Sequence, residues 1–289
     1  MPENFFLSEE ILEQIIDGGN RTIMVIGASD SGKTTFVEQI AKICSLTRKT
    51  AIVDIDPGQS HIGPPTTVAW GMVEKKEFEG WEKLKIKGFY FVGDTSPTGN
   101  LLPVITGARL MWDEAIRQAD KVILDTTGLV RGNIGKILKL HLIDLLKPEV
   151  IFALYREDEL EHILSFFRGV KFPRIFKLPV PSDVILKDFT FRRNYRQKKF
   201  RDYFKFAREI EFIPEEIGIS KNLSPDYLNM RLISLRDKNN QDIALGIIKE
   251  LNERKDRVVV YSPVSNPERV GAVVFGRLKL TLEGVEMRF

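Results

Sequence analysis

Several kinds of residue are scarce in this sequence of 289 residues, and each shortage excludes a class of protein. The single cysteine, Cys44, excludes an internal disulfide, and three scattered histidines offer no cluster for a zinc site. No apolar stretch approaches the roughly 20 residues that cross a bilayer, so we expect no membrane span and no membrane partner. With 43% hydrophobic and 29% charged residues, the composition is typical of a folded protein, and the cysteine usage favours a cytoplasmic location.

Positive charge is concentrated in one segment. The whole chain has a net charge of +3, but residues 192–208 alone contain eight Lys or Arg and one Asp, so the remainder is mildly acidic. A local basic segment of this kind predicts an element that handles a polyanion, more than general coating of nucleic acid. A solvated basic helix is the alternative, because Phe191, Tyr195, Tyr203 and Ala207 recur at helical spacing.

Short apolar runs alternate with helical stretches over most of the chain. Because these runs are continuously apolar, each is predicted to be a strand buried on both faces. Repetition of strand and helix predicts an α/β fold in which helices flank a parallel sheet. The predicted strands are 22–26, 51–55, 88–92, 121–124 and 150–154, and the predicted helices are 34–46, 103–118, 134–146 and 157–167.

The alternation ends near residue 215, where we predict a boundary. Residues 1–215 would form the main domain, including an Arg-rich helix near 188–210. Residues 216–289 would form a small mixed α/β domain or an extension of the sheet. Within this second region, strands are predicted at 230–235, 258–261 and 270–280, around a helix at 243–252.

Residues 27–34 match the phosphate-loop pattern G-x-x-x-x-G-K-[ST] at every fixed position. An apolar run precedes them and a helical stretch follows, as this loop requires. The glycines let the backbone wrap closely around phosphate, Lys33 acts in catalysis by neutralising the outer phosphates, and the Thr34 hydroxyl binds Mg²⁺. The sequence therefore predicts a nucleoside triphosphate with Mg²⁺, held by Gly27, Ala28, Ser29, Asp30, Ser31, Gly32, Lys33, Thr34 and Thr35.

Two carboxylates, Asp54 and Asp56, follow the next predicted strand in the segment D-I-D-P-G-Q. Since ligands meet the carboxyl ends of parallel strands, both are expected beside the phosphate loop. One can hold the metal and the other can accept a proton, although either alone can also be a cap or turn former. Asp125 ends a third apolar run, where it could supply another Mg²⁺ ligand or cap the Gly-rich turn that follows.

These motifs together resemble the polynucleotide 5'-hydroxyl kinases, which include the RNA kinase of the pre-mRNA cleavage machinery, nucleolar kinases of ribosomal RNA processing and archaeal relatives. The resemblance covers roughly residues 20–280 and implies a P-loop NTPase fold that transfers the γ-phosphate of ATP to the 5'-hydroxyl of RNA or DNA. It rests on the phosphate loop, D-x-D-x-G-Q at 54–59, T-x-G at 126–128, R-x-x-x-R at 192–196 and S-P…G…F-G-x-L-x-L at 262–280.

The resemblance also implies roles for individual residues. Asp56 would be the general base that removes the proton of the 5'-hydroxyl, while Asp54 and Thr34 would serve Mg²⁺. Arg192 and Arg196 would act in catalysis as a lid over the triphosphate, where arginine can stabilise the transition state. The residues that would grip the nucleic-acid end, expected to be RNA more than DNA, are Gln59, Thr126, Thr127 and Gly128.

Two other classes of function are open at this point. One is a regulatory NTPase switch, because the segment 125–128 resembles D-x-x-G and Gly63-Pro64-Pro65 resembles the insert of GPN-loop GTPases. No Asn-Lys-x-Asp guanine reader occurs in the sequence, which argues against a GTPase. The other is a non-catalytic ATP-binding scaffold of an RNA-processing assembly, which would need Lys33 and Thr34 but neither Asp56 nor Arg196.

Overall fold

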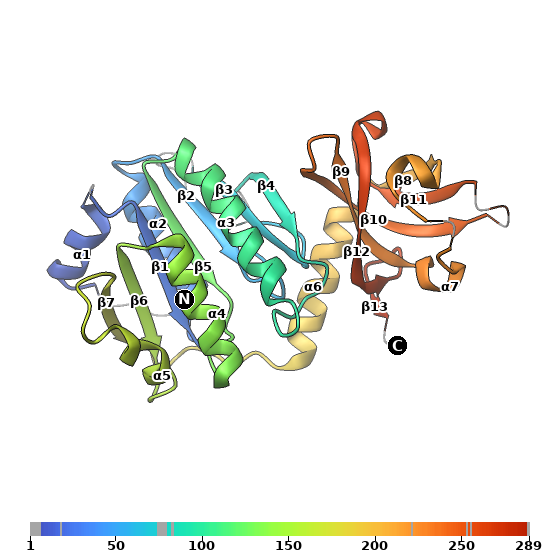
Figure 1. Ribbon diagram of the computed structural model, residues 1–289. Helices are drawn as coiled ribbons and strands as arrows, with labels where there is room; N and C mark the ends of the chain where they lie inside the picture. The colour runs from blue at the N-terminus through green and yellow to red at the C-terminus, as the bar shows by residue number, and fades with distance from the viewer. Residues whose placement is uncertain are drawn as a thin grey trace.

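The computed structural model of the protein describes residues 7–287, except for residues 18, 74–79, 82–83, 221, 253 and 255. The described chain forms two β-sheets that lie side by side, with one long helix running between them (Figure 1). No helix in this described part is both long and apolar enough to cross a membrane.

The first sheet has the strand order β4-β3-β2-β5-β1-β6-β7. The strands from β2 to β7 in this order are parallel, whereas β3 and β4 are antiparallel. This arrangement confirms the predicted P-loop α/β fold class, with a second sheet near the C-terminus. The strands are β1 (Thr22–Gly27), β2 (Thr50–Ile55), β3 (Thr67–Val73), β4 (Ile86–Phe91), β5 (Lys121–Thr126), β6 (Val150–Tyr155) and β7 (Arg174–Pro179).

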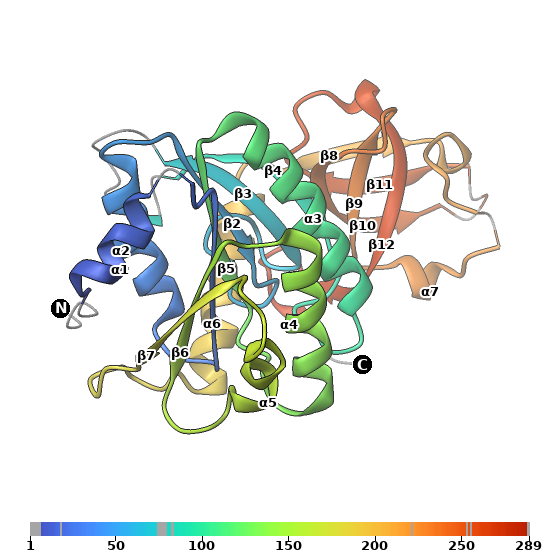
Figure 2. The same cartoon turned by 60° about the vertical axis from the view of Figure 1, so that its left-hand side comes forward.

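Helices cover both faces of the first sheet (Figure 2). In β1, Met24 and Ile26 join the apolar core on one face, and Ile23 and Val25 join the core on the other. The continuous apolar run of this strand therefore reflects burial on both faces, as predicted. One face carries α1 (Glu9–Ile16) and α2 (Lys33–Ser45), and the other carries α3 (Leu101–Gln118), α4 (Gly132–Leu146) and α5 (Glu161–Leu164).

Three strands of this sheet differ from the sequence-based prediction. The run at 88–92 lies in β4, which is an antiparallel edge strand and not a buried parallel one. β3 and β7 had no predicted counterpart. The apolar pattern of a run does not encode its direction in the sheet, and the hairpin between β2 and β3 depends on the folded loop between them.

The second sheet has the order β13-β12-β9-β10-β11-β8, and its strands pair in antiparallel fashion. The strands predicted at 230–235, 258–261 and 270–280 correspond to β9, β11 and β12. The elements are β8 (Arg208–Phe212), α7 (Pro225–Leu228), β9 (Arg231–Asp237), β10 (Asp242–Leu251), β11 (Val258–Ser262), β12 (Val270–Leu280) and β13 (Glu286–Met287).

The helix predicted at 243–252 is wrong, because these residues form β10. Leu245 and Ile247 pack into one apolar cluster, and Ala244 and Ile248 pack into another on the opposite face. With both faces buried, the alternation of apolar and polar residues that marks a strand is absent. The packing around Gly246 has no room for a side chain, since a Cβ there would lie 2.6 Å from Val260 Cγ1 of the neighbouring strand.

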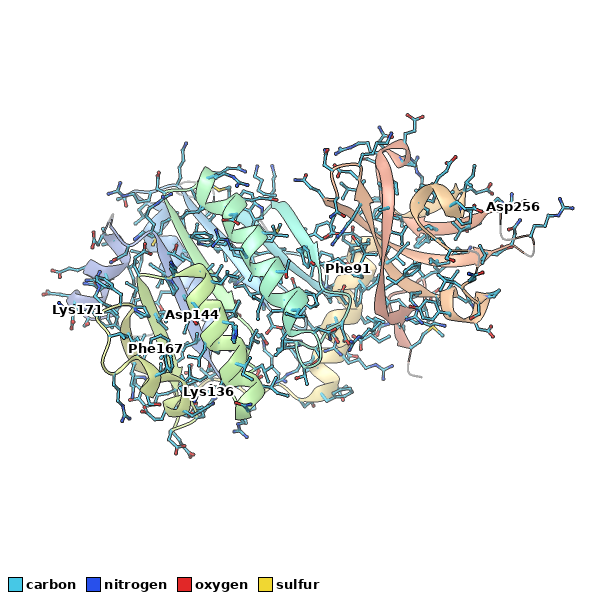
Figure 3. The ribbon with its side chains drawn as sticks, viewed as in Figure 1. Phe91, Lys136, Asp144, Phe167, Lys171 and Asp256 are labelled. Carbon is cyan, nitrogen blue, oxygen red and sulfur yellow. The ribbon has the colours of Figure 1, made fainter. Side chains whose placement is uncertain are left out.

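The long helix α6 (Phe189–Phe204) joins the two sheets (Figure 1). Its C-terminal residues Phe200 and Phe204 are buried with Phe91 and residues of the second sheet. Figure 3 labels Phe91 at this junction, where its backbone N–H donates to Asp242 Oδ2 at 2.9 Å. The chain enters the second sheet at β8, before the boundary predicted at residue 215, and the division into two domains stays a prediction.

Candidate active site

The phosphate loop connects the end of β1 to the start of α2. Gly32 has φ +78°, a left-handed conformation that favours glycine, immediately before the helix. A Cβ on Gly27 would lie 2.8 Å from Leu154 O of the neighbouring strand β6. Lys33 is only 8% exposed, and its Nζ donates to Ala28 O at 2.7 Å. Burial lowers the pKa of Lys33, against the opposing charge of nearby carboxylates such as Asp125 and Asp56.

A cavity of about 580 Å³ opens at the carboxyl ends of the central parallel strands. Lys33 and Asp56 both line it, so an open space connects the lysine of the phosphate loop with the predicted general base. Gly27, Ala28, Asp54, Thr127 and Arg196 are not among the lining residues. The predicted site residues that line the cavity are Ser29, Asp30, Ser31, Gly32, Lys33, Thr34, Thr35, Asp56, Gln59, Thr126, Gly128 and Arg192.

Asp56 is oriented by the loop that follows it. Its Oδ1 accepts the backbone N–H of Gly58 at 2.9 Å and that of Gln59 at 3.1 Å. A Cβ on Gly58 would lie 2.5 Å from Thr95 O, so the loop packs tightly against its neighbour. Asp56 therefore has both roles that the sequence allowed. Its Oδ1 stabilises the Asp-Pro-Gly turn through two backbone hydrogen bonds, and its carboxylate lines the cavity.

Asp54 is buried, and its carboxylate accepts hydrogen bonds from the backbone of the same loop. Its Oδ2 accepts the backbone N–H of His61 at 2.6 Å and that of Ile62 at 3.2 Å, and its Oδ1 accepts that of Asp56 at 3.1 Å. Burial and the neighbouring Asp125 charge raise the pKa of Asp54. Both oxygens of Asp54 thus accept backbone donors, and Asp54 lies beside Asp125 on the neighbouring strand; its predicted role at Mg²⁺ stays a prediction.

Asp125 is the carboxylate that contacts Thr34. The Thr34 hydroxyl donates to Asp125 Oδ2 at 2.9 Å. Burial raises the pKa of Asp125, while the charge of Lys33 opposes this shift. Its Oδ1 is buried and has no hydrogen-bond partner among the described residues. Mg²⁺ favours one or two carboxylate oxygens together with hydroxyl, water and phosphate oxygens, so Thr34 and Asp125 fit this ion.

Two further buried polar atoms of the cavity lack partners within the described chain, Ser31 Oγ and Arg192 Nε. Buried polar atoms are almost always hydrogen-bonded, and exceptions call for an explanation. Ser31, Asp125 and Arg192 all line the same cavity. Two donors and one acceptor on residues that line the same cavity suit a ligand with phosphate oxygens and a cation.

The two arginines of the predicted lid have different partners. Arg192 Nη2 forms an ion pair with Asp30 Oδ2 of the phosphate loop at 2.6 Å. Arg196, which is 9% exposed, donates through Nε and Nη2 to the carboxylate of Glu286 in β13. The structure therefore brings Arg192 to the nucleotide site, whereas Arg196, one turn further along the same helix, pairs with the second sheet, and its predicted role over the triphosphate stays a prediction.

The turn 126–128 follows β5 beside the phosphate loop. Thr126 donates its hydroxyl to Val25 O at 2.8 Å, so this hydroxyl is used inside the fold. A Cβ on Gly128 would lie 2.6 Å from Ser29 N, which shows how closely the turn packs on the phosphate loop. Lys139 of α4 donates to Thr126 Oγ1 at 2.9 Å and to Thr127 O at 2.5 Å.

Sequence reasoning missed Lys139 in this region, and it placed His61, which follows Gln59 and Ser60, near the proposed acceptor site but argued against a contact with substrate. Lys139 is fully buried, and the only signal for it was a lysine within the apolar face of a predicted helix. His61 lines the cavity between the rings of Trp81 and Tyr195. Burial lowers the pKa of His61 to about 3, so the imidazole is neutral at physiological pH.

The fold and the site define the chain as a P-loop enzyme that binds a nucleoside triphosphate, with a carboxylate across the cavity. Residues 27–205 match the family model described as "mRNA cleavage and polyadenylation factor CLP1 P-loop". The chain belongs to this family, and the resemblance drawn from the motifs is confirmed.

Individual relatives agree with this assignment. A polyribonucleotide 5'-hydroxyl-kinase of Pyrococcus furiosus is 28% identical, over 92% of this chain and 89% of the relative. A protein of the same name from Methanocaldococcus jannaschii is 29% identical, over 92% of this chain and 88% of the relative. The solved structure of Clp1p in complex with Pcf11p has a TM-score of 0.70 at 13% identity, covers 90% of this chain and 74% of that one, and supports the fold alone.

Proposed function

We propose that this protein is an ATP-dependent polynucleotide 5'-hydroxyl kinase, with RNA as the preferred acceptor over DNA. The observation that carries the proposal is the cavity shared by Lys33 and Asp56. A triphosphate on the phosphate loop would place its terminal phosphate at Lys33, and an acceptor hydroxyl would meet Asp56 across the same space. The names of the archaeal relatives, polyribonucleotide 5'-hydroxyl-kinases, support RNA as the acceptor. A cytoplasmic location stays a prediction.

The residues of the cavity divide the work of phosphoryl transfer. Asp56 accepts the proton of the 5'-hydroxyl as the oxygen forms a bond with the γ-phosphorus. The bond from that phosphorus to the bridging oxygen breaks, and ADP leaves. Lys33 balances the charge on the phosphate oxygens, and Arg192 becomes available to do so when it exchanges Asp30 for phosphate.

Mg²⁺ is part of the proposal, with Thr34 and Asp125 as its protein ligands. The partnerless Oδ1 of Asp125 supports this choice over Asp54, whose oxygens hold the loop of residues 56–62. When bound, the ion supplies positive charge to the phosphate oxygens. Asp54 then supports the site indirectly, because it accepts the backbone N–H of the general base Asp56.

Incubation with γ-labelled ATP and 5'-hydroxyl oligonucleotides of RNA and DNA tests the proposal. We expect transfer of label to the 5' end, with a higher kcat/KM for RNA. Lys33→Ala should abolish transfer, while Lys42→Ala, on the exposed part of α2 where Lys42 pairs with Glu38, should leave it unchanged.

The two competing functions give different results in the same assay. Nucleotide hydrolysis without transfer to any oligonucleotide would identify a regulatory NTPase switch. Tight ATP binding with neither hydrolysis nor transfer would identify a non-catalytic scaffold. Either result would overturn the kinase proposal.

A further inference from the structure

Lys139 is a charged residue buried next to the site, with no part in the chemistry proposed above. It lies in α4, where its side chain is fully buried beside Leu138 and Leu142. Burial of a lysine without compensation is unfavourable, so buried lysines have polar partners and often a function. Lys139 has two such partners, Thr126 Oγ1 and Thr127 O, both in the turn beside the phosphate loop.

The contacts of this turn connect Lys139 with the cavity. Thr126 and Gly128 line the cavity, and Gly128 packs directly against the backbone of Ser29. Lys139 itself is not among the lining residues, so it reaches the cavity only through the turn. A shift of the Lys139 ammonium group would therefore act on the backbone of Thr127, between two residues that line the cavity.

The surrounding charges also place Lys139 within electrostatic reach of the reacting groups. Burial, followed by the charge of Lys33 in α2, lowers the pKa of Lys139 to about 7. Asp56, after β2, and Asp125, in β5, oppose this shift. The ammonium group contacts Thr126 and Thr127, while Lys33, Asp56 and Asp125 line the cavity.

We propose that Lys139 is a positioning residue, which holds the turn of residues 126–128 in the geometry that accepts the end of the polynucleotide. This inference rests on the proposed function, since it assigns a role in acceptor use to that same site. Lys139 acts through Thr126 and Thr127 and does not contact the substrates.

The chain offers a matched control in β5, the strand that leads into the turn contacted by Lys139. Lys121, at the start of β5, is 1% exposed and donates to the backbone carbonyls of Ile15 and Asp17. Thr126, at the other end of β5, borders the cavity. Lys121 and Lys139 are thus both buried lysines bonded to oxygen acceptors, but only Lys139 is bonded to the turn at the active site.

The experiment compares Lys139→Met with Lys121→Met in steady-state phosphoryl transfer, with the active fraction measured for each. For Lys139→Met we expect kcat/KM for the oligonucleotide to fall by about 10-fold to 100-fold, because misplaced reacting groups lose rate steeply. The KM for ATP should stay within about twofold of wild type. Lys121→Met should lower the melting temperature without changing either kinetic constant.

A conservative variant separates positioning from simple loss of packing. Lys139→Gln keeps an N–H donor on a side chain one atom shorter, so it should recover part of the lost acceptor kcat/KM. If Lys139→Met does not fold, Lys139→Gln is judged by the same comparison with Lys121→Met.

Three results would overturn the inference. One is equal loss of acceptor kcat/KM in the Lys139 and Lys121 variants. Another is a rise in the KM for ATP with unchanged use of the acceptor. The third is a Lys139→Gln variant no better than Lys139→Met. If the wild-type protein transfers no phosphate, the proposed function itself is wrong. This outcome is distinguishable because it is measured on the wild-type protein, before any variant is compared.

Discussion

The two sheets of this protein bury polar side chains in different ways. In the second sheet, Arg236 pairs with Asp242 at 2.8 Å, and no buried side-chain oxygen or nitrogen there lacks a hydrogen-bond partner among the residues described. Beside the first sheet, Ser31 of the phosphate loop, Asp125 of β5 and Arg192 of α6 line one cavity, and each has a buried polar atom without such a partner; Thr66 and Arg174 also have one, away from the cavity. Among the described residues, the buried polar side chains of the second sheet therefore have their hydrogen-bond partners within the protein, whereas three residues of the cavity beside the first sheet have a polar atom left for a ligand. Substitutions should therefore affect stability in one sheet and activity in the other.

The largest difference is expected between two carboxylates. Asp56→Asn should lower kcat by about 10² to 10⁴ while ATP still binds, because the general base is lost. Asp242→Asn should lower the melting temperature, because it weakens the pair with Arg236, and should leave kcat per folded molecule near wild type. Single-turnover phosphoryl transfer and thermal unfolding measure the two effects. A near-normal rate for Asp56→Asn would remove its role as base.

Two glycines allow the same steric test, one in the turn after β5 and one in β10 of the second sheet. Gly128→Ala would place a Cβ 2.6 Å from Ser29 N of the phosphate loop, and transfer should fall by about 100-fold because the turn must shift. Gly246→Ala would place a Cβ 2.6 Å from Val260 Cγ1, and should instead reduce stability by about 1–3 kcal/mol. Initial rates and urea unfolding of both variants provide the test. Equal activity in the two variants would contradict the comparison.

Substitution of the two arginines of α6 should likewise separate an effect on activity from an effect on stability. Arg192→Ala should lower kcat by about tenfold, because it removes a cation at the cavity. Arg196→Ala should reduce the free energy of unfolding by about 1–3 kcal/mol, because Glu286 is left without its partner. A double-mutant cycle with Glu286→Gln measures the coupling. A loss of kcat in Arg196→Ala with unchanged stability would restore its predicted place over the triphosphate.

The smallest effect concerns the pH dependence of Mg²⁺ use. The pKa of Asp125 is raised by burial, so its protonated fraction increases at mildly acidic pH, and a protonated carboxyl is a poor ligand. The Mg²⁺ concentration for half-maximal rate should therefore rise as pH falls, by up to about tenfold per unit below that pKa. Titration of Mg²⁺ across pH, with Asp125→Asn as the variant that flattens the profile, measures this. A requirement independent of pH would exclude Asp125 as a ligand.

The sequence was most informative where local pattern and chemistry coincide. The phosphate loop has a fixed spacing between a strand and a helix, and this spacing was enough to locate Lys33 and Thr34. The carboxylate beside Thr34 was harder to predict, because Asp54 and Asp125 both end strands. Only the fold shows that Asp54 accepts backbone donors of its own loop while Asp125 contacts Thr34 and keeps an oxygen without a partner among the described residues.

Long-range pairing was beyond the reach of sequence patterns. Arg192 and Arg196 lie one helical turn apart, yet Glu286 draws Arg196 toward β13. The strand β10 was predicted as a helix, because burial on both faces removes its alternation. Lys139 belongs to no sequence motif. Its proposed role became visible only from its hydrogen bonds to Thr126 and Thr127, which belong to another element of the fold.

The anchoring of α6 connects the second sheet to the nucleotide site. One end of this helix holds Arg192 over the phosphate loop, while Phe200 and Phe204 at the other end are embedded in the core shared with the second sheet. The helix is therefore not a loose flap. Because Arg192 and the buried Phe200 and Phe204 belong to one continuous helix, a movement of the second sheet relative to the first would be transmitted to the arginine at the cavity.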